Sequence, residues 1–408
     1  MGKIELVEKI VVVPEQPTPR KRMFLSNIDL SLVVYQDSAS FFDPPNTQMS
    51  FSEICSKLYS ALGKMLVQYD FMAGRLVPSL EETQRFEIDC NGAGIVVAAA
   101  RTDRKLSEFG VISAPNPQLR ELVVFLHEGC DQETDLKEKP LASLQLTQFG
   151  CGSLALASHY NHCTLDGFAI RDFEVNLGAL TRGEDLITVP NADRTLLRAR
   201  TPPIVSHPHF EYSKSTVTHN LFTLRGKSGT NVKQSLQENQ IHVLHLSPQS
   251  IGSFKKKALE EDKTLKNTST FQVVPELPDG FAGNALVPGF ARATVRELKE
   301  LEDACHIRKV QEGLERLNDE YIKSGIDWLE VNKGAPCMED SFSLVAWWRL
   351  GLEEQLFAWG RLKCATPLEV KPGLVMLLPG PQDQGGINIC LDLPEDQMQE
   401  FSRIMLQI

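Results

Sequence analysis

The sequence predicts an α/β or α+β fold built on mixed sheets. Strand-like and helix-like stretches alternate along the chain, but without the regular βαβ rhythm that a fully parallel sheet requires. The 408 residues are enough for two or three well-filled cores. Hydrophobic residues make up 42% of the chain and charged residues 23%, which is the balance of a globular protein and excludes disordered and fibrous classes.

The apolar pattern predicts three buried strands and two long helices. The expected strands are 94–100, 122–126 and 154–157. Apolar residues recur at helical spacing from Ile54 to Met65, and Ser52 is the expected N-cap of this helix. A second helix is expected from about Thr294 to Lys323. Its core-facing stripe consists of Leu298, Leu301, Val310, Leu314, Leu317 and Tyr321.

A polar stretch in the middle of the chain predicts a two-domain organisation. Between Thr201 and Asn239 the sequence turns polar and irregular, and it contains the turn residues Pro, Ser and Gly. We therefore expect an N-terminal domain over residues 1–205, a crossover linker over 206–240 and a C-terminal domain over 241–408.

Net charge and hydropathy exclude two classes of partner. Lys and Arg number 42 against 53 Asp and Glu, so the net charge of −11 repels a nucleic-acid backbone. No apolar run approaches the roughly 18 residues of a membrane span. The first eight residues lack the apolar stretch of a signal peptide, and nine Cys are scattered without a CxxC pair. We expect a cytoplasmic protein with reduced thiols.

Residues 153–168 form the most informative stretch for chemistry. An apolar strand ends at His162, and a helix begins near Gly167 with Asp166 at its start. Binding and catalytic residues commonly follow the C-terminal ends of strands. Three interpretations stay open here: a structural N-cap beside an interior histidine, a metal site that includes His159, and a catalytic base. Alternation along a strand turns His159 and His162 to opposite faces, which disfavours the metal.

The segment from His162 to Gly167 resembles the HxxxDG signature of the plant BAHD acyl-CoA-dependent acyltransferases. Six further landmarks of that family occur in its order: LSNID at 25–29, YDFMAGRL at 69–76, DCNGAG at 89–94, LPDGFAGN at 277–284, LFAWG at 356–360 and LPG at 378–380. Residues 161–167 and 193–203 are similar to the branch that transfers hydroxycinnamoyl groups to ω-hydroxy fatty acids and fatty alcohols for suberin, cutin or wax.

The resemblance implies two similar chloramphenicol-acetyltransferase-like domains with mixed sheets and a central solvent channel. It implies a monomer without a bound cofactor, which uses acyl-coenzyme A as co-substrate and a small hydroxylated molecule as acceptor. Because the donor carries phosphates, Lys255 and Lys256 are candidate binding residues at a position that resembles the coenzyme A phosphate region of the family.

We expect His162 to act as the general base. A neutral histidine can take the proton of an alcohol, whose oxygen then attacks the thioester carbonyl, so no acyl-enzyme is needed. Gly167 is expected to let the backbone approach closely. The resemblance implies that Asp166 points away from the substrate and shapes the loop, and that the indole N–H of Trp359 meets the developing oxyanion.

Two departures from the family pattern favour an alternative. Leu356 and Ala358 replace the Asp and the Gly before the Trp in the family's DFGWG motif, and a helix remainder with the following VDxRxR strand is missing after Val274. The resemblance implies that this Asp pairs with the Arg of the missing strand, so an Asp here would be left unpaired. The alternative is a catalytically silent member that acts as a binding partner in fatty-acid elongation or wax synthesis.

Overall fold

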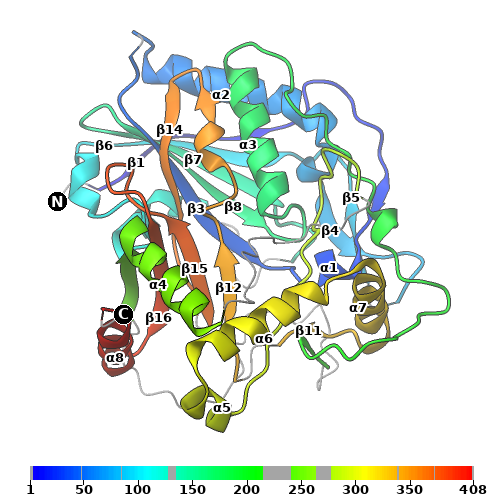
Figure 1. Ribbon diagram of the computed structural model, residues 1–408. Coiled ribbons are helices and arrows are strands. Elements are labelled where there is room, and N and C mark those ends of the chain that lie inside the picture. The colour runs from blue at the N-terminus through cyan, green and yellow to red at the C-terminus, as the bar shows by residue number, and fades with distance from the viewer. Residues whose placement is uncertain are drawn as a thin grey trace.

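Two mixed sheets, both flanked by helices, organise the chain (Figure 1). The structure, a computed structural model, describes residues 3–46, 48–83, 85–126, 135–214, 240–262, 277–337, 340–371 and 373–406. The mixed α/β fold predicted from the sequence is confirmed. Within the described ranges, no helix combines the length and apolar character needed to cross a bilayer.

The larger sheet has seven strands and carries the segment that ends at His162. Their spatial order is β1 (Glu5–Val12), β6 (Ile95–Thr102), β7 (Ala142–Phe149), β8 (Leu154–Asn161), β3 (Tyr35–Phe42), β14 (Gly360–Pro367) and β13 (Leu356–Phe357). Only the β6–β7 pair is parallel among these neighbours. The strands predicted at 94–100 and 154–157 are β6 and β8. Because β13 and β14 come from the C-terminal half, this sheet joins both halves of the chain.

Helices α2 (Phe51–Gln68) and α3 (Gly167–Thr181) cover one face of this sheet (Figure 1). The main core lies between these helices and the sheet and includes Phe42, Leu62, Leu156, Phe173 and Leu177. The short helices η2 (Leu106–Phe109) and η3 (Pro117–Val123) help to cover the other face. The sheet is therefore buried on both sides, as the continuously buried β8 requires.

Capping residues correct two sequence predictions. The N-cap of α2 is Ser50 rather than Ser52, because the Ser50 hydroxyl accepts from the Glu53 N–H and the Glu53 carboxylate accepts from the Ser50 N–H. The strand predicted at 122–126 is wrong. Asn116 caps η3 and a proline occupies the first helical turn, so the apolar run begins inside this short helix.

The smaller sheet has four strands from the C-terminal half. Their order is β10 (Gln240–Leu246), β16 (Ile387–Leu393), β15 (Leu374–Pro379) and β12 (Ser343–Ala346), with β12 parallel to β15. Helix α8 (Glu395–Leu406) packs on this sheet through Met398, and α4 (Pro248–Glu261) lies beside β10 (Figure 1). Ala114 packs with Met376 and Leu378 in another cluster of this sheet, so the two halves share core.

Two minor sheets complete the strands of the described ranges. One has the order β2 (Arg22–Phe24), β5 (Phe86–Asp89) and β4 (Arg75–Pro78), and the other pairs β11 (Ala335–Pro336) with β9 (Tyr212–Ser213). The short α1 (Asn27–Leu30) begins three residues after β2 and contacts α7 (Asp319–Asn332), a helix of the C-terminal half.

The long helix predicted over 294–323 is three helices. They are α5 (Val295–Glu300), α6 (Asp303–Glu315) and α7 (Asp319–Asn332), and the N-caps Thr294 and Asn318 start the first and the third. The predicted stripe is buried only at Leu317 and Tyr321, while Leu298 is 60% exposed and Val310 52% exposed. Helical spacing alone therefore overestimated the burial of α5 and α6.

Two sequence predictions lie outside the described residues. Most of the expected linker, residues 215–239, belongs to this part of the chain. So does Val274, after which the family's helix remainder and strand are missing, because residues 263–276 are also outside the described ranges.

Candidate active site

His162 directly follows the last residue of β8 and opens the loop that leads into α3. Its backbone N–H donates to the Val34 carbonyl at 2.8 Å, just before β3 begins, so the loop starts from a fixed point of the sheet. The ring Nδ1 lies 3.1 Å from Oδ1 of Asn284. Nε2 has no protein hydrogen-bond partner within the described ranges and is not among their fully buried unpaired atoms. Nδ1 is thus held by Asn284, and Nε2 is available to contact a substrate.

Asn284 fixes the tautomer of His162. The Asn284 Nδ2 group donates to Oδ1 of Asp29 and to the His162 carbonyl, each at 2.8 Å. Both partners only accept, so the amide nitrogen must face them and the amide oxygen must face the ring. Nδ1 of the neutral imidazole therefore carries the proton, and the lone pair lies on Nε2.

Burial lowers the pKa of His162 below its ordinary value of 6.5. Its own backbone carbonyl, the Asp166 charge, the Asn284 hydrogen bond and the Asp29 charge oppose this shift without cancelling it. The imidazole is therefore neutral at pH 7, which is the protonation state that a general base needs.

The Asp166 carboxylate is occupied by backbone N–H groups. Oδ1 accepts from the Ala169 N–H at 3.0 Å as the N-cap of α3, and Oδ2 accepts from the Ala285 N–H at 2.9 Å. Burial raises the pKa of Asp166 above its ordinary value. The two hydrogen bonds favour the carboxylate and oppose this rise without cancelling it. Asp166 therefore ties the start of α3 to the segment that contains Asn284.

Gly167 is the first residue of α3 and lies under Leu350. A Cβ at this position would stand 3.1 Å from two methyl carbons of Leu350, which is tighter than an ordinary contact. The residue packed over Gly167 thus comes from the C-terminal half.

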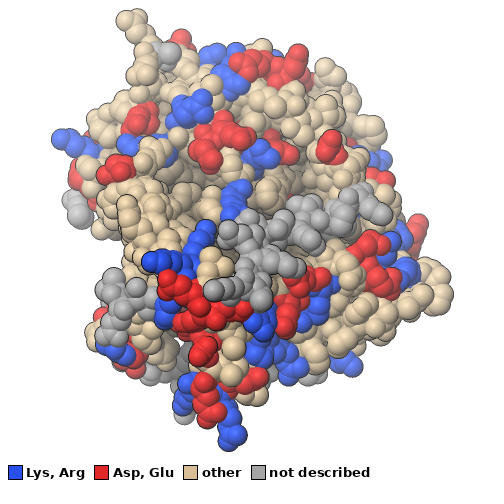
Figure 2. Space-filling model, viewed as in Figure 1, with Lys and Arg blue, Asp and Glu red and all other residues tan. Residues whose placement is uncertain are grey.

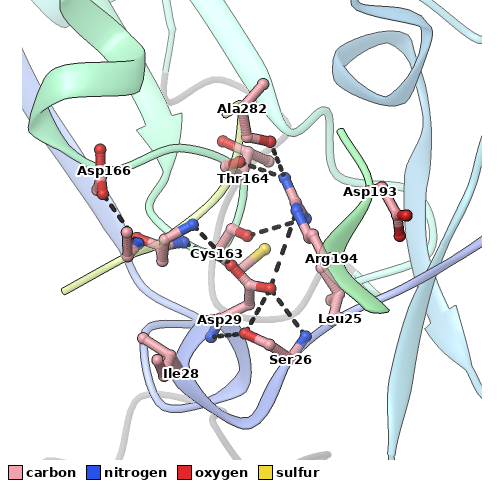
Figure 3. A network of polar contacts seen from close by, with 12 residues as sticks. Leu25, Ser26, Ile28, Asp29, Cys163, Thr164, Asp166, Asp193, Arg194 and Ala282 are labelled. Carbon is pink, nitrogen blue, oxygen red and sulfur yellow. Dashed lines mark hydrogen bonds and ion pairs between the residues drawn. The ribbon is translucent and has the colours of Figure 1, made fainter. Parts of the chain in front are cut away.

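Arg194 clamps the His162–Gly167 loop from behind. It is 1% exposed and opens the short helix η4 (Arg194–Leu197). Its Nη2 donates to the carbonyls of Thr164 and Ala282, and its Nε lies 3.8 Å from Oδ2 of Asp29 (Figure 3). One buried guanidinium therefore joins the base loop, the 277–284 segment and α1.

Sequence reasoning missed the roles of Asp29, Arg194 and Asn284. All three lie in stretches that were recognised only as family landmarks or branch markers, at 25–29, 193–203 and 277–284. The usable signal was the residue type, because a charged or amide side chain inside an otherwise apolar landmark must find a buried partner.

Trp359 lies in the turn between β13 and β14, far from His162. Its indole stacks on Phe357 with centroids 4.8 Å apart and meets Phe42 edge to face at 5.9 Å. Phe42 pairs with Leu154 at the start of β8, whereas His162 follows its end. At ~3.3 Å per residue, Leu154 and His162 are separated by more than about 20 Å along the strand. The packing therefore does not support the oxyanion role expected for Trp359.

The turn at Leu356 is anchored without the Asp of the family motif. Arg182, the C-cap of α3, donates to the Leu356 carbonyl, and the Ala358 N–H donates to Oγ1 of Thr181 at 3.0 Å. A Cβ at Gly178 would lie 2.4 Å from the Leu356 carbonyl oxygen, so only glycine allows this approach. Main-chain contacts with α3 replace a carboxylate brace.

Lys255 and Lys256 are exposed on α4, on the side of the smaller sheet. The Nζ of Lys256 lies 3.8 Å from Glu260, one turn further along the helix. Neither lysine contacts the His162 loop in the described ranges. Figure 2 shows acidic and basic side chains intermixed over this lower part of the molecule.

His159 turns to the other face of β8, as strand alternation predicted. Its Nδ1 lies 2.6 Å from Oδ1 of Asp37, and its ring stacks on Tyr35 with centroids 4.4 Å apart. Among the described residues, no group of three or more His, Cys, Asp and Glu side chains is placed to hold a metal ion.

The chain matches the family model described as the Transferase family in two segments, residues 2–275 and 271–407. The segments meet beside Val274. Acyltransferase GLAUCE of Arabidopsis thaliana is 31% identical over 433 aligned positions, with 98% of this chain and 94% of the relative covered. The alignment is longer than the chain, so GLAUCE has residues that this chain lacks. Omega-hydroxypalmitate O-feruloyl transferase of A. thaliana is 28% identical, with 98% and 92% covered.

Among solved structures, vinorine synthase superposes with a TM-score of 0.70 at 18% identity, covering 97% of this chain and 96% of its own. That likeness supports the same fold. The family model and the relatives together cover nearly the whole chain. The chain therefore belongs to the Transferase family, the BAHD acyl-CoA-dependent acyltransferases.

Proposed function

We propose that the chain transfers a hydroxycinnamoyl group, such as feruloyl, from coenzyme A to a hydroxyl of a long-chain acceptor. The carrying observation is His162, whose Nδ1 is held by Asn284 while Nε2 stays available on a neutral ring. The acceptor class rests on the similarity of 161–167 and 193–203 to the fatty-acceptor branch. The similarity to omega-hydroxypalmitate O-feruloyl transferase supports it.

The proposed reaction needs one proton acceptor and no covalent intermediate. Nε2 of His162 accepts the proton of the acceptor hydroxyl as its oxygen forms a bond to the thioester carbonyl carbon. The tetrahedral intermediate then collapses, the carbon–sulfur bond breaks and coenzyme A leaves as a thiolate. The imidazolium returns its proton to that sulfur, so the enzyme ends as it began.

The other site residues position the base. Asp166 and Gly167 keep the loop against the 282–285 segment and Leu350. Cys163, next to the base, is fully buried and its pKa is raised well above the ordinary value by burial, so it stays a thiol. This supports direct transfer without an acyl-cysteine.

Lys255 and Lys256 are proposed to attract the donor phosphates. Exposed ammonium groups act on a polyanion through long-range charge, so their effect should fall on the KM for acyl-coenzyme A. Reversing both charges, K255E with K256E, is expected to raise that KM severalfold at low salt without changing kcat. Lys299→Glu on α5 is the control. If it raised the KM for acyl-coenzyme A as much as the double variant does, α4 would have no specific part in donor binding.

A silent binding partner is the second candidate function, and Leu356 and Ala358 are the observations that favour it. The anchoring of this turn by Arg182 and Thr181 weighs against it, because the fold keeps the turn without the family's Asp. A silent member would be indifferent to His162→Ala and would be recovered with an elongase subunit in a pull-down.

The deciding experiment measures free coenzyme A thiol released from feruloyl-CoA, with ω-hydroxypalmitate as acceptor. Acceptor-dependent release is expected, and its rate should fall by about two to four orders of magnitude in His162→Ala. His242→Ala on β10 is the matched control and should keep the rate. Release that survives in His162→Ala would refute the base; no release from folded wild-type protein would favour the silent partner.

A further inference from the structure

A concave site lies between α6, α7 and residues 207–210, outside the candidate active site. Its volume is about 310 Å³, at the small end of the range for ligand sites. None of His162, Asp166 and Asn284 lines it. A ligand here would therefore be distinct from the reacting substrates.

The wall of this pocket is aromatic. Phe210 and Phe290 meet edge to face with their centroids 5.8 Å apart. The rings of Tyr321 and His207 meet in the same way at 5.5 Å. Such ring edges and faces suit a planar apolar ligand, because aromatic rings prefer edge-to-face and offset-stacked contacts.

Two guanidinium groups stand over these rings. Arg292 lies 4.1 Å from the centroid of Phe210, and Arg316 lies 4.5 Å from that of Phe290. In the part of the chain that the structure describes, neither guanidinium forms an ion pair with a carboxylate. Lys309 also lines the pocket but pairs with Glu297 at 3.0 Å.

The pocket is therefore positive in a protein that is negative as a whole. Its lining contains the two guanidinium groups and the Lys309 ammonium against a single carboxylate, that of Glu312. Arg316 is held in place by a hydrogen bond to the Phe290 carbonyl. An anionic ligand group would meet guanidinium donors that have no competing carboxylate partner.

A buried network fixes the position of the Tyr321 ring. The Tyr321 hydroxyl donates to Oε1 of Glu211 at 2.7 Å, and the same oxygen lies 2.7 Å from Nδ1 of His209. Nε2 of His209 lies 2.8 Å from Oγ of Ser324 in the middle of α7. Because the hydroxyl is occupied, Tyr321 offers its ring to the pocket, and a fixed wall lowers the entropic cost of binding.

We propose that this pocket binds a small aromatic carboxylate. The ring of the ligand lies against Phe210 and Phe290, and its carboxylate accepts hydrogen bonds from Arg292 and Arg316. Guanidinium–carboxylate pairs are charge-assisted and match in geometry, so they select a carboxylate over a neutral group of similar shape. The proposal does not rest on the transferase reaction, because it concerns none of the residues around His162.

Isothermal titration calorimetry of the full chain tests this with three probes: cinnamate, cinnamyl alcohol and acetate. Cinnamate combines ring and carboxylate, while the other two probes each retain one of these features. We expect cinnamate to bind at least tenfold more tightly than either probe. Arg292→Gln should weaken cinnamate binding about tenfold, and Phe210→Ala should weaken it severalfold.

Arg296→Gln on α5 is the matched control, since Arg296 is exposed, lies outside the pocket and stands 4.0 Å from Glu300. Arg292 and Phe210 are exposed too, so their variants should keep the wild-type circular dichroism spectrum and melting temperature. Equal affinities for cinnamate and cinnamyl alcohol would overturn the proposal. So would unchanged cinnamate affinity in Arg292→Gln, which would assign the binding to another place.

Discussion

Nε2 of His162 can serve as a base because two other side chains determine where the ring proton lies. Asp29 holds the amide of Asn284 in one orientation, and the amide holds the proton on Nδ1. The chain Asp29–Asn284–His162 thus connects α1 to the end of β8 through two hydrogen bonds. The Asn284 bond also raises the pKa of His162, against the larger effect of burial.

Replacing Asn284 by Ala should therefore change both rate and pH dependence. Loss of one positioned hydrogen bond to a catalytic base is expected to lower kcat/KM by roughly tenfold to a hundredfold. Since the bond raises the pKa of His162, the acidic limb of the kcat/KM profile should move to lower pH. Asn332→Ala, at the C-terminal end of α7, serves as control. A lower rate with an unmoved acidic limb would indicate that Asn284 supports the fold only.

Glu174 is a buried carboxyl whose ionisation should affect stability. Burial raises its pKa from 4.5 to about 7, and the hydrogen bond from Gln355 Nε2 lowers it only partly. Oε1 of Gln355 is buried and has no partner in the described ranges. Only a protonated Glu174 has an O–H group that could supply the donor which this oxygen lacks.

The free energy of unfolding should therefore fall as pH rises from 4.5 to 7. In that window the unfolded state releases the Glu174 proton and the folded state retains it, so alkaline conditions favour unfolding, by on the order of 2–3 kcal/mol once complete. Glu174→Gln keeps an acceptor for the Gln355 amide without a titrating group and should lose this dependence. Urea unfolding at pH 5 and pH 8 checks it, with exposed Glu260→Gln as control; parallel behaviour of Glu174→Gln and wild type would contradict the assignment.

At the scale of elements, the candidate active site is built from several segments that lie far apart in the sequence. The loop after β8, α1, η4 and the 277–284 segment each contribute polar side chains, and Arg194 of η4 contacts the other three (Figure 3). Its planar fork supplies donors in several directions, which one ammonium group does not reproduce. The aromatic face of Phe71, 5.1 Å away, completes its surroundings.

Arg194→Lys should consequently loosen the base loop although the charge is kept. We expect the free energy of unfolding to drop by about 2 kcal/mol or more, because buried carbonyls lose their donors. Transferase activity should fall further than stability alone explains. Arg198→Lys, at the C-cap of the same short helix and 48% exposed at its side chain, should change stability by less than about 0.5 kcal/mol. Equal destabilisation by both variants would argue against the clamp.

For the whole molecule, sequence patterns predicted those helices and strands whose formation depends on residues close together in the chain. The end of β8, the N-cap Asp166 and the helix α3 followed from apolar alternation and capping, which act over a few residues. The contacts of Trp359 and Arg194 did not follow from the sequence, because their surroundings come from strand pairing and loop contacts across the chain. The 294–323 stretch was read as one helix because its spacing continues, although Asn318 begins a new one.

The two halves are joined where β13 and β14 enter the large sheet beside β3, and Gly178 tests this joint. A Cβ there would press on the Leu356 carbonyl at 2.4 Å, so either α3 or the turn must move. We expect Gly178→Ala to lower the free energy of unfolding by roughly 1–3 kcal/mol, as overpacking does, despite the better helix propensity of alanine. Gly252→Ala in α4 has no atom within 4 Å of its new Cβ and should be neutral or stabilising by up to about 1 kcal/mol. Chemical denaturation followed by tryptophan fluorescence compares the two. If Gly178→Ala were as stable as Gly252→Ala, the turn would be free to move away from α3, and the main-chain anchoring of Leu356 would not hold the halves together.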